Sequence, residues 1–234
     1  ILDYVHNATT NQLNFSADNY SVLRAAFLTF NGVENLDVIG GVAINSNDLI
    51  FAKGTGNYDG KGGVDALVAD LSAMTSPVTL VTGSGQTYNY LGSSFSNFEG
   101  FLVSTGDADD YIDSRGNIIN NHLLLAKGSN TAFTGSGNDY ISTGSGDDTI
   151  DSDAGNDQIL AGEGDNTVRA GAGHDTVTTG SGDDWIEVLT GNDVVDSGMG
   201  DDTSKISVDR PDSVLAGLGT DRLSIDASTF SYLA

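Results

Sequence analysis

The sequence predicts an all-β chain whose short parallel strands coil into a β-solenoid, with two nine-residue repeats in each coil. Three observations lead to this prediction. Glycine is the fourth residue of eight consecutive nonamers that run from Thr134 to Lys205. Asp or Asn is the sixth residue of all eight, and Ile or Val is the eighth residue of seven. A short fixed period indicates stacked coils, because one such unit cannot bury its apolar residue alone.

Each nonamer divides into a six-residue turn and a three-residue strand. The nonamers read TGSGNDYIS, TGSGDDTID, SDAGNDQIL, AGEGDNTVR, AGAGHDTVT, TGSGDDWIE, VLTGNDVVD and SGMGDDTSK. Glycines at positions two and four allow a tight turn with positive φ. The middle strand residue points inward and its neighbours point outward. We therefore expect the eighth residues to form the core and Trp185, beside Ile186, to face outward, whereas Ser204 leaves its core position unfilled.

Two nonamers make one 18-residue coil, so the turns are expected to stack in two columns. One column holds Asp139, Asp157, Asp175 and Asp193, and the other holds Asp148, Asn166, Asp184 and Asp202. Because coils are about 4.8 Å apart, these carboxylates repel each other unless a cation separates them. Calcium suits such turns, since it accepts carboxylate and backbone carbonyl oxygens in flexible geometry, whereas magnesium requires a stricter octahedron.

The composition excludes several classes of protein. The 234 residues include 33 acidic and 9 basic ones, for a net charge of −24, and no Cys. No disulfide, Cys-ligated zinc site or thiol nucleophile is therefore possible, and binding of nucleic acid is disfavoured. No apolar run is long enough to cross a membrane. No HExxH, GxSxG or P-loop motif occurs, so we expect no catalytic residue, no enzyme activity and no cofactor other than calcium.

The repeats GSGNDYI, GSGDDTI, AGAGHDTV and GSGDDWI resemble the GGxGxDxUx nonapeptide of the RTX (repeats-in-toxin) family. The resemblance implies a right-handed parallel β-roll with several calcium ions between the turns of successive coils. It also implies type I secretion to the cell surface or the extracellular space of a Gram-negative bacterium or cyanobacterium. The implied carboxylate ligands are Asp110, Asp139, Asp148, Asp157, Asp175, Asp184, Asp193, Asp202 and Asp221. The implied carbonyl ligands lie around Gly135, Gly137, Gly144, Gly146, Gly155, Gly162, Gly164, Gly171, Gly173, Gly180, Gly182, Gly191, Gly198 and Gly200.

Some repeats depart from the family pattern. Asn166 lacks a charge, and we expect weaker calcium sites beside it and at the end of the array. Upstream, the same period continues in degraded form through 105–113, 116–124 and 125–133, where Asn121 and Asn130 replace Asp. Asn in this place predicts coils that are held by side-chain ladders instead of calcium.

A longer duplication divides the chain, because the segment around Glu34 parallels the segment around Glu99. We predict a degenerate solenoid unit with an insertion at 1–68, a second at 69–133, the calcium-binding β-roll at 134–224, and the start of a further, truncated unit at 225–234. Segments 5–30 and 73–96 break the nonamer and are expected to be loops or lateral insertions, with a short strand or helix at 21–29. Glu34 and Glu99 are expected to be equivalent structural positions, not a catalytic pair.

These inferences predict a structural module that folds on binding calcium, within a secreted repetitive surface or extracellular protein of the surface-layer or adhesin type. The alternative is a C-terminal accessory module of a type I-secreted enzyme. A third, less favoured alternative is a carbohydrate- or ice-binding surface. The expected partners are calcium and neighbouring repeats or copies of the same protein.

Overall fold

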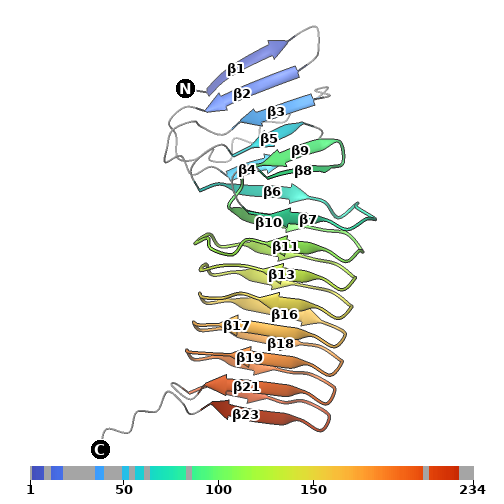
Figure 1. Ribbon diagram of the computed structural model, residues 1–234, viewed down its shortest axis with the longest axis vertical. Helices are drawn as coiled ribbons and strands as arrows, with labels where there is room; N and C mark the ends of the chain where they lie inside the picture. The colour runs from blue at the N-terminus through green and yellow to red at the C-terminus, as the bar shows by residue number, and fades with distance from the viewer. Residues whose placement is uncertain are drawn as a thin grey trace, which may run out of the picture. The chain divides into compact units, whose positions relative to one another are not determined.

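The computed structural model describes residues 2–7, 12–17, 35–39, 49–52, 56–60, 64–82, 86–207 and 211–226, and every regular element in these ranges is a strand (Figure 1). The chain forms two compact units. Unit 1 comprises residues 1–71 and 80–103, and unit 2 comprises residues 72–79 and 104–234. The predicted all-β chain with parallel coils is confirmed.

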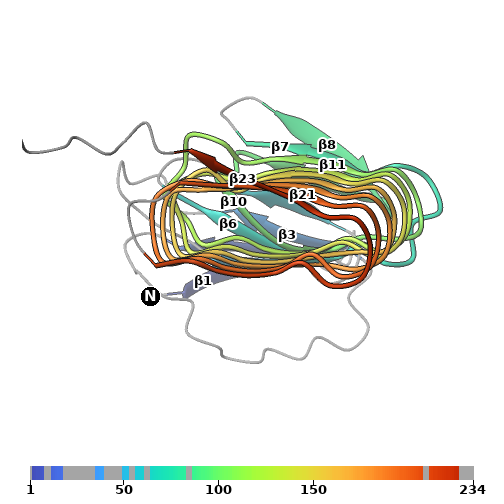
Figure 2. The same cartoon turned by 90° about the horizontal axis from the view of Figure 1, so that it is seen from below.

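Unit 2 contains a β-solenoid in which odd- and even-numbered strands form two facing parallel sheets, joined by turns at both ends (Figure 2). The odd strands are β11 (Tyr111–Asp113), β13 (Thr131–Phe133), β15 (Thr149–Asp151), β17 (Thr167–Gly171), β19 (Trp185–Val188), β21 (Thr203–Ser207) and β23 (Arg222–Asp226). The even strands are β12 (His122–Leu124), β14 (Tyr140–Ser142), β16 (Gln158–Gly162), β18 (Thr176–Thr179), β20 (Val194–Asp196) and β22 (Ser213–Leu215).

The strand register confirms the predicted 18-residue coil. Tyr140 pairs with Gln158, and Thr149 pairs with Thr167. The two ends of the array deviate from this spacing. Tyr111 pairs with Thr131, in agreement with the two-residue slip in the degraded repeats, and Thr203 pairs with Arg222, which places one extra residue in the last coil.

The core of unit 2 is built from two inward positions in each nonamer, where the sequence predicted one. Position eight is buried as expected, and Ile141, Ile159 and Val177 are 0 % exposed. Position one, assigned to the turn from the sequence, is also buried, because it lies two residues after position eight and strands β16, β17, β18 and β19 continue through it. Its residues are Thr134, Thr143, Ser152, Ala161, Ala170, Thr179, Val188 and Ser197.

The hydroxyl groups at position one join successive coils. Thr179 Oγ1 donates to the Ser197 carbonyl at 2.8 Å, and Ser152 Oγ donates to the Ala170 carbonyl at 3.0 Å. At the frayed end, Ser204 is buried and Ile206 supplies an apolar side chain two residues later. Leu223 occupies position eight of the last coil that the structure describes, and it is 51 % exposed because no further described coil covers it.

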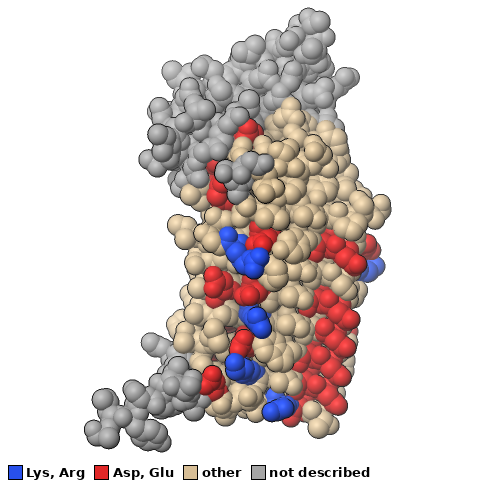
Figure 3. Space-filling model, in the orientation of Figure 1, with Lys and Arg blue, Asp and Glu red and all other residues tan. Residues whose placement is uncertain are grey.

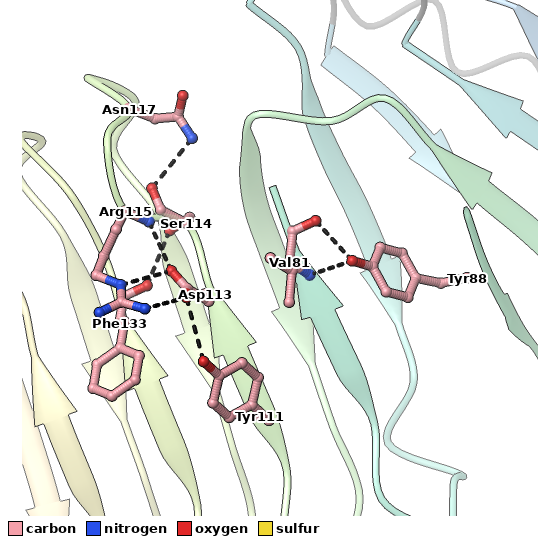
Figure 4. Close-up of polar contacts among 8 residues, drawn as sticks. All are labelled: Val81, Tyr88, Tyr111, Asp113, Ser114, Arg115, Asn117 and Phe133. Carbon is pink, nitrogen blue, oxygen red and sulfur yellow. Dashed lines mark hydrogen bonds and ion pairs between the residues drawn. The ribbon is translucent and has the colours of Figure 1, made fainter. Parts of the chain in front are cut away.

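The outward face of the odd sheet carries both signs of charge. Arg115 binds Asp113 through Nε at 3.0 Å and Nη2 at 2.6 Å, and its guanidinium lies 4.4 Å from the centre of the Phe133 ring (Figure 4). Burial alone would raise the pKa of Asp113, but the hydrogen bonds from Arg115 outweigh it and hold that pKa below its ordinary value. Further along the sheet, Glu187 accepts Lys205 Nζ at 2.5 Å.

The predicted outward position of Trp185 is confirmed by its partial exposure and by the guanidinium of Arg169, 5.4 Å from its ring. Trp185 pairs with Thr167 on one side and Thr203 on the other. It therefore interrupts an outward row of threonines on the odd sheet.

In the part of unit 1 that the structure describes, the regular elements are also all strands. Its strands are β1 (Leu2–Asn7), β2 (Gln12–Ala17), β3 (Asn35–Ile39), β4 (Leu49–Ala52), β5 (Asn57–Asp59), β6 (Ala66–Asp70), β8 (Thr87–Tyr90), β9 (Ser93–Ser96) and β10 (Gly100–Ser104), and β7 (Thr79–Val81) begins at the boundary of the two units. Parallel pairs join β3 to β5, β5 to β9, and β4 to β6.

Two antiparallel hairpins in unit 1 lie largely within segments 5–30 and 73–96, which were predicted to be loops or lateral insertions. Strand β1 pairs with β2, and β8 pairs with β9. The second hairpin is held by Tyr88, whose hydroxyl donates to the Val81 carbonyl and accepts the Val81 N–H, both at 2.8 Å (Figure 4). The predicted element at 21–29 lies outside the described residues.

Glu99 has a structural contact in unit 1. Its carboxylate accepts the N–H of Asp65 at 2.9 Å, and burial raises its pKa. Glu34, its predicted counterpart, lies outside the described residues.

Candidate metal centre

The position-six side chains of unit 2 lie in two buried columns, one at each end of the coils. The odd column precedes the odd strands and consists of Asp110, Asn130, Asp148, Asn166, Asp184, Asp202 and Asp221. The even column precedes the even strands and consists of Asn121, Asp139, Asp157, Asp175, Asp193 and Asp212. Asp139, Asp157 and Asp175 are at most 2 % exposed, although each carries a carboxylate.

One oxygen of each position-six side chain is used to stack the coils. The N–H of Asp139 donates to Asp157 Oδ1 at 2.8 Å, and the N–H of Asp157 donates to Asp175 Oδ1 at 2.9 Å. The same bond joins Asp184 to Asp202 in the odd column, at 2.9 Å. These bonds confirm the two columns that the sequence predicted.

The second carboxylate oxygen has no such partner. Oδ2 is buried without a hydrogen bond in Asp110, Asp139, Asp148, Asp157, Asp175, Asp184 and Asp202. A buried oxygen of this kind raises the free energy of the metal-free fold. Burial, together with the charge of neighbouring carboxylates, raises the pKa of Asp157 to about 6 and the pKa of Asp175 to about 7.

The position-four glycines bring backbone oxygens to the same place. Gly155 has a φ of 147°, and a Cβ there would lie 1.7 Å from the carbonyl oxygen of Gly137, one coil earlier. Gly173 repeats this arrangement, since its Cβ would lie 1.5 Å from the oxygen of Gly155. Each position-four carbonyl therefore points along the solenoid toward the next glycine, which explains why all eight nonamers have Gly there.

The turn carbonyls differ in how they are satisfied. At position two, Gly180 accepts the N–H of Met199 at 2.9 Å, and at position three, Glu163 accepts the N–H of Gly146 at 2.9 Å. In the described turns, the position-four carbonyls of Gly137, Gly155 and Gly173 accept no backbone N–H. These carbonyl oxygens therefore have no hydrogen bond from the backbone.

Calcium fits this set of donors. Each turn offers a buried carboxylate oxygen and carbonyl oxygens, which is the mixture that calcium accepts. Among the described residues, no three His, Cys, Asp or Glu side chains gather closely enough to hold a metal by themselves. An ion here therefore needs further ligands, and the backbone carbonyls of the turns are suitable ones.

Position five forms a second, exposed pair of ladders that the sequence did not reveal. On the side of the odd column, the N–H of Asp165 donates to Asp147 Oδ1 at 2.9 Å, and the N–H of Asp183 donates to Asp165 Oδ1 at 2.8 Å. Figure 3 shows an acidic stripe along one edge of the described coils. On the side of the even column, His174 occupies the same position and is exposed, and its Nδ1 accepts the N–H of Asn192 at 2.8 Å.

Comparison with known protein families identifies the repeats. Residues 126–203 match the family model of the RTX calcium-binding nonapeptide repeat in four overlapping copies, at 126–159, 153–186, 160–195 and 178–203. The chain carries RTX repeats. The RTX nonapeptide family binds Ca²⁺, and several repeats imply several ions. RTX repeats are typical of secreted extracellular bacterial proteins.

Other comparisons give no further relative. No curated protein and no solved structure matches the chain. Among the described residues, no helix has the length and apolar character that a membrane span needs.

The columns extend beyond the matched RTX repeats. Asp110 lies upstream of them and accepts the N–H of Val78 at 2.7 Å, and Asp221 lies downstream and accepts the N–H of Asp202 at 3.1 Å. Asp212 also belongs to the even column, because its Oδ1 accepts the N–H of Asp193 at 3.0 Å. Sequence reasoning missed Asp212, since its repeat has lost both glycines. The signal that remained is an Asp two residues before Val214, the spacing from position six to position eight.

Proposed function

We propose that the chain is a structural module that folds on binding calcium, within a secreted repetitive surface or extracellular protein. Ions between successive coils bind to the position-six carboxylates of Asp139, Asp148, Asp157, Asp175, Asp184, Asp193 and Asp202. The carbonyls around the turn glycines complete each site. Weaker sites follow at Asp110 and Asp221, at the ends of the columns.

The observation that carries this proposal is a buried Oδ2 without a hydrogen bond in turns whose position-four carbonyls accept no backbone N–H. Both kinds of oxygen accept hydrogen bonds and neither donates one, so a cation satisfies both. Residues 134–205 include 16 acidic and two basic residues, so the carboxylates of stacked turns also repel one another. Binding energy at such sites is folding energy, because the unfolded chain has no preformed site.

A calcium titration tests the proposal. We expect an expanded, weakly structured chain in excess EDTA that becomes compact and β-rich at calcium concentrations of about 10⁻⁴–10⁻³ M, the range of extracellular calcium modules. Far-UV circular dichroism and hydrodynamic radius are the measurements, and magnesium at equal concentration is the control. A compact, β-rich chain in EDTA would contradict the coupling of folding to calcium.

The sequence of the full-length gene tests which kind of protein contains the module. Many further copies of these units support a repetitive surface-layer or adhesin-type protein, in which neighbouring repeats or copies are the partners. A catalytic domain upstream supports the alternative, an accessory module of a type I-secreted enzyme.

A further inference from the structure

The asparagines in the two columns make a contact that the aspartates cannot make. Asn130 Nδ2 donates to the carbonyl of Gly128 at 3.0 Å, and Asn166 Nδ2 donates to the carbonyl of Gly164 at 2.9 Å. Asn121 Nδ2 donates to the carbonyl of Ile119 at 3.1 Å. All three amides thus share one acceptor, the position-four carbonyl of the same turn, two residues before the asparagine. Asn121 Nδ2 also donates to Asp139 Oδ1 at 3.0 Å, and Asn166 Nδ2 also donates to the Gly162 carbonyl at 3.4 Å.

Asparagine keeps the other role of position six unchanged. The N–H of Asp148 donates to Asn166 Oδ1 at 3.0 Å, and the N–H of Asn166 donates to Asp184 Oδ1 at 2.8 Å. These distances match those between two aspartates. Asn and Asp therefore occupy the column in the same way and differ at one atom. Where Asp places an acceptor oxygen near the turn carbonyl, Asn places an N–H donor.

We propose that the carboxamides of Asn121, Asn130 and Asn166 take the place of calcium in their turns, so that these positions of the columns close without a metal ion. This inference rests on the proposed function, since it assigns which turns of the calcium-binding array require the ion. The amide satisfies the position-four carbonyl and removes one buried negative charge. The turn then has neither the excess acceptor nor the charge that a cation would offset.

The distribution of these asparagines divides the array. Asn121 and Asn130 lie in the first coils of unit 2, whose strands β12 and β13 bury Leu123 and Ala132 completely. The even column then runs from Asp139 to Asp212 without an amide, whereas the odd column is interrupted at Asn166. The coils around residues 116–133 are thus metal-independent and offer a formed surface on which the calcium-dependent coils stack.

Exchange of Asp and Asn tests this inference in the full chain. Asp175→Asn should lower the number of bound calcium ions by one and lower the calcium concentration at which the chain folds. Asn166→Asp should have the opposite effect, with one more ion bound and more calcium needed. Asp175→Ala is the matched control, because it removes the carboxylate but supplies no donor. We expect it to lose the ion and to raise the calcium midpoint roughly tenfold, since the turn carbonyl and the coil contact stay unsatisfied.

Two measurements give the readouts. Isothermal titration with CaCl₂ counts the ions, and circular dichroism gives the calcium midpoint of folding. If Asp175→Asn raises the midpoint as Asp175→Ala does, or if Asn166→Asp binds no additional ion, the inference is wrong while calcium-dependent folding of the unchanged chain stands. If the unchanged chain neither binds calcium nor folds with it, the proposed function fails, and this inference fails with it.

Discussion

At the scale of single residues, the even column brings carboxylates together where water cannot reach them. Asp157 and Asp175 are 2 % and 1 % exposed, and each Oδ1 is fixed by the backbone N–H of the preceding coil. Their charges are therefore neither hydrated nor paired with a basic side chain. A bound ion removes this penalty, and protonation is the second way to remove it.

This arrangement predicts that acid stabilises the calcium-free fold. Burial raises the pKa of Asp157 to about 6 and that of Asp175 to about 7, well above the ordinary value of 3.8, so the folded state binds protons more tightly than the unfolded state. The destabilisation caused by these buried charges is absent below the pKa that the carboxyl groups have in the unfolded chain. It reaches its full size as the pH rises through their higher pKa values in the folded chain. The calcium-free chain should therefore gain β structure between about pH 7 and pH 4.

Circular dichroism of the chain, stripped of metal and followed across that pH range, checks this expectation. Asp175→Asn serves as control, because it removes the group with the highest pKa and should flatten the upper part of the transition. β structure in the calcium-free chain that falls, or stays constant, on acidification would contradict the prediction.

At the scale of the structural element, the solenoid depends on a close approach of neighbouring turns. Gly171 has a φ of 80°, and a Cβ at this position would lie 1.6 Å from the carbonyl oxygen of Asp153. Gly116 has nearly the same φ, 83°, but no atom lies within 4 Å of its Cβ position. Asp153 itself stands where most repeats have Gly, and it adopts a positive φ of 64°. Backbone conformation and space are thus two separate constraints on the turns.

Alanine substitutions separate these two constraints. Gly116→Ala should lower the free energy of unfolding of the calcium-loaded chain by about 1 kcal/mol, the usual cost of a left-handed backbone for a residue with a Cβ. Gly171→Ala carries the same backbone cost, and in addition it forces adjacent coils apart, so its loss should exceed 3 kcal/mol, roughly the scale of severe core overpacking.

Denaturant unfolding at saturating calcium provides both free energies. Equal losses for the two variants would mean that neighbouring coils do not approach each other as closely as the structure places them.

At the scale of the whole molecule, charge and core act in opposite directions. The net charge is −24, and the repeats bury only small or aliphatic side chains at positions one and eight. Basic side chains of unit 2 such as Arg115, Arg169 and Lys205 pair with acids on the outward face and do not reach the columns. These basic side chains therefore leave the buried charge of the columns without compensation, and a bound cation would offset it.

Salt and calcium should have different effects for this reason. Raising KCl to about 1 M shortens the screening length to roughly 3 Å and should contract the calcium-free chain without producing β structure. Millimolar calcium should produce both contraction and β structure, because coordination satisfies the buried oxygens and screening does not. Hydrodynamic radius and circular dichroism, recorded together in each salt, make the distinction. A β-rich spectrum in KCl alone would show that screening is sufficient.

The fold of unit 2 and most residues of the two position-six columns, its candidate metal sites, could be predicted from the sequence. The nine-residue repeat has Gly at position four and an aliphatic residue at position eight. This pattern predicts one regular structure, an 18-residue coil with Ile141 and Ile150 facing inward. The same period assigns Asp139 and Asp148 to different columns. Such features are local or periodic, so the order of residues is enough to derive them.

Tertiary structure decided the remaining features, since they depend on distances between coils. The burial of position one, the approach of the Gly137 carbonyl to Gly155, and the reach of the Asn166 amide to the Gly164 carbonyl arise only when turns are stacked. Asp212 enters its column because the backbone restores the register after an extra residue, which no repeat pattern records. The sequence by itself determined which residues recur, and the stacking of coils determined which of their oxygens are left to bind a cation.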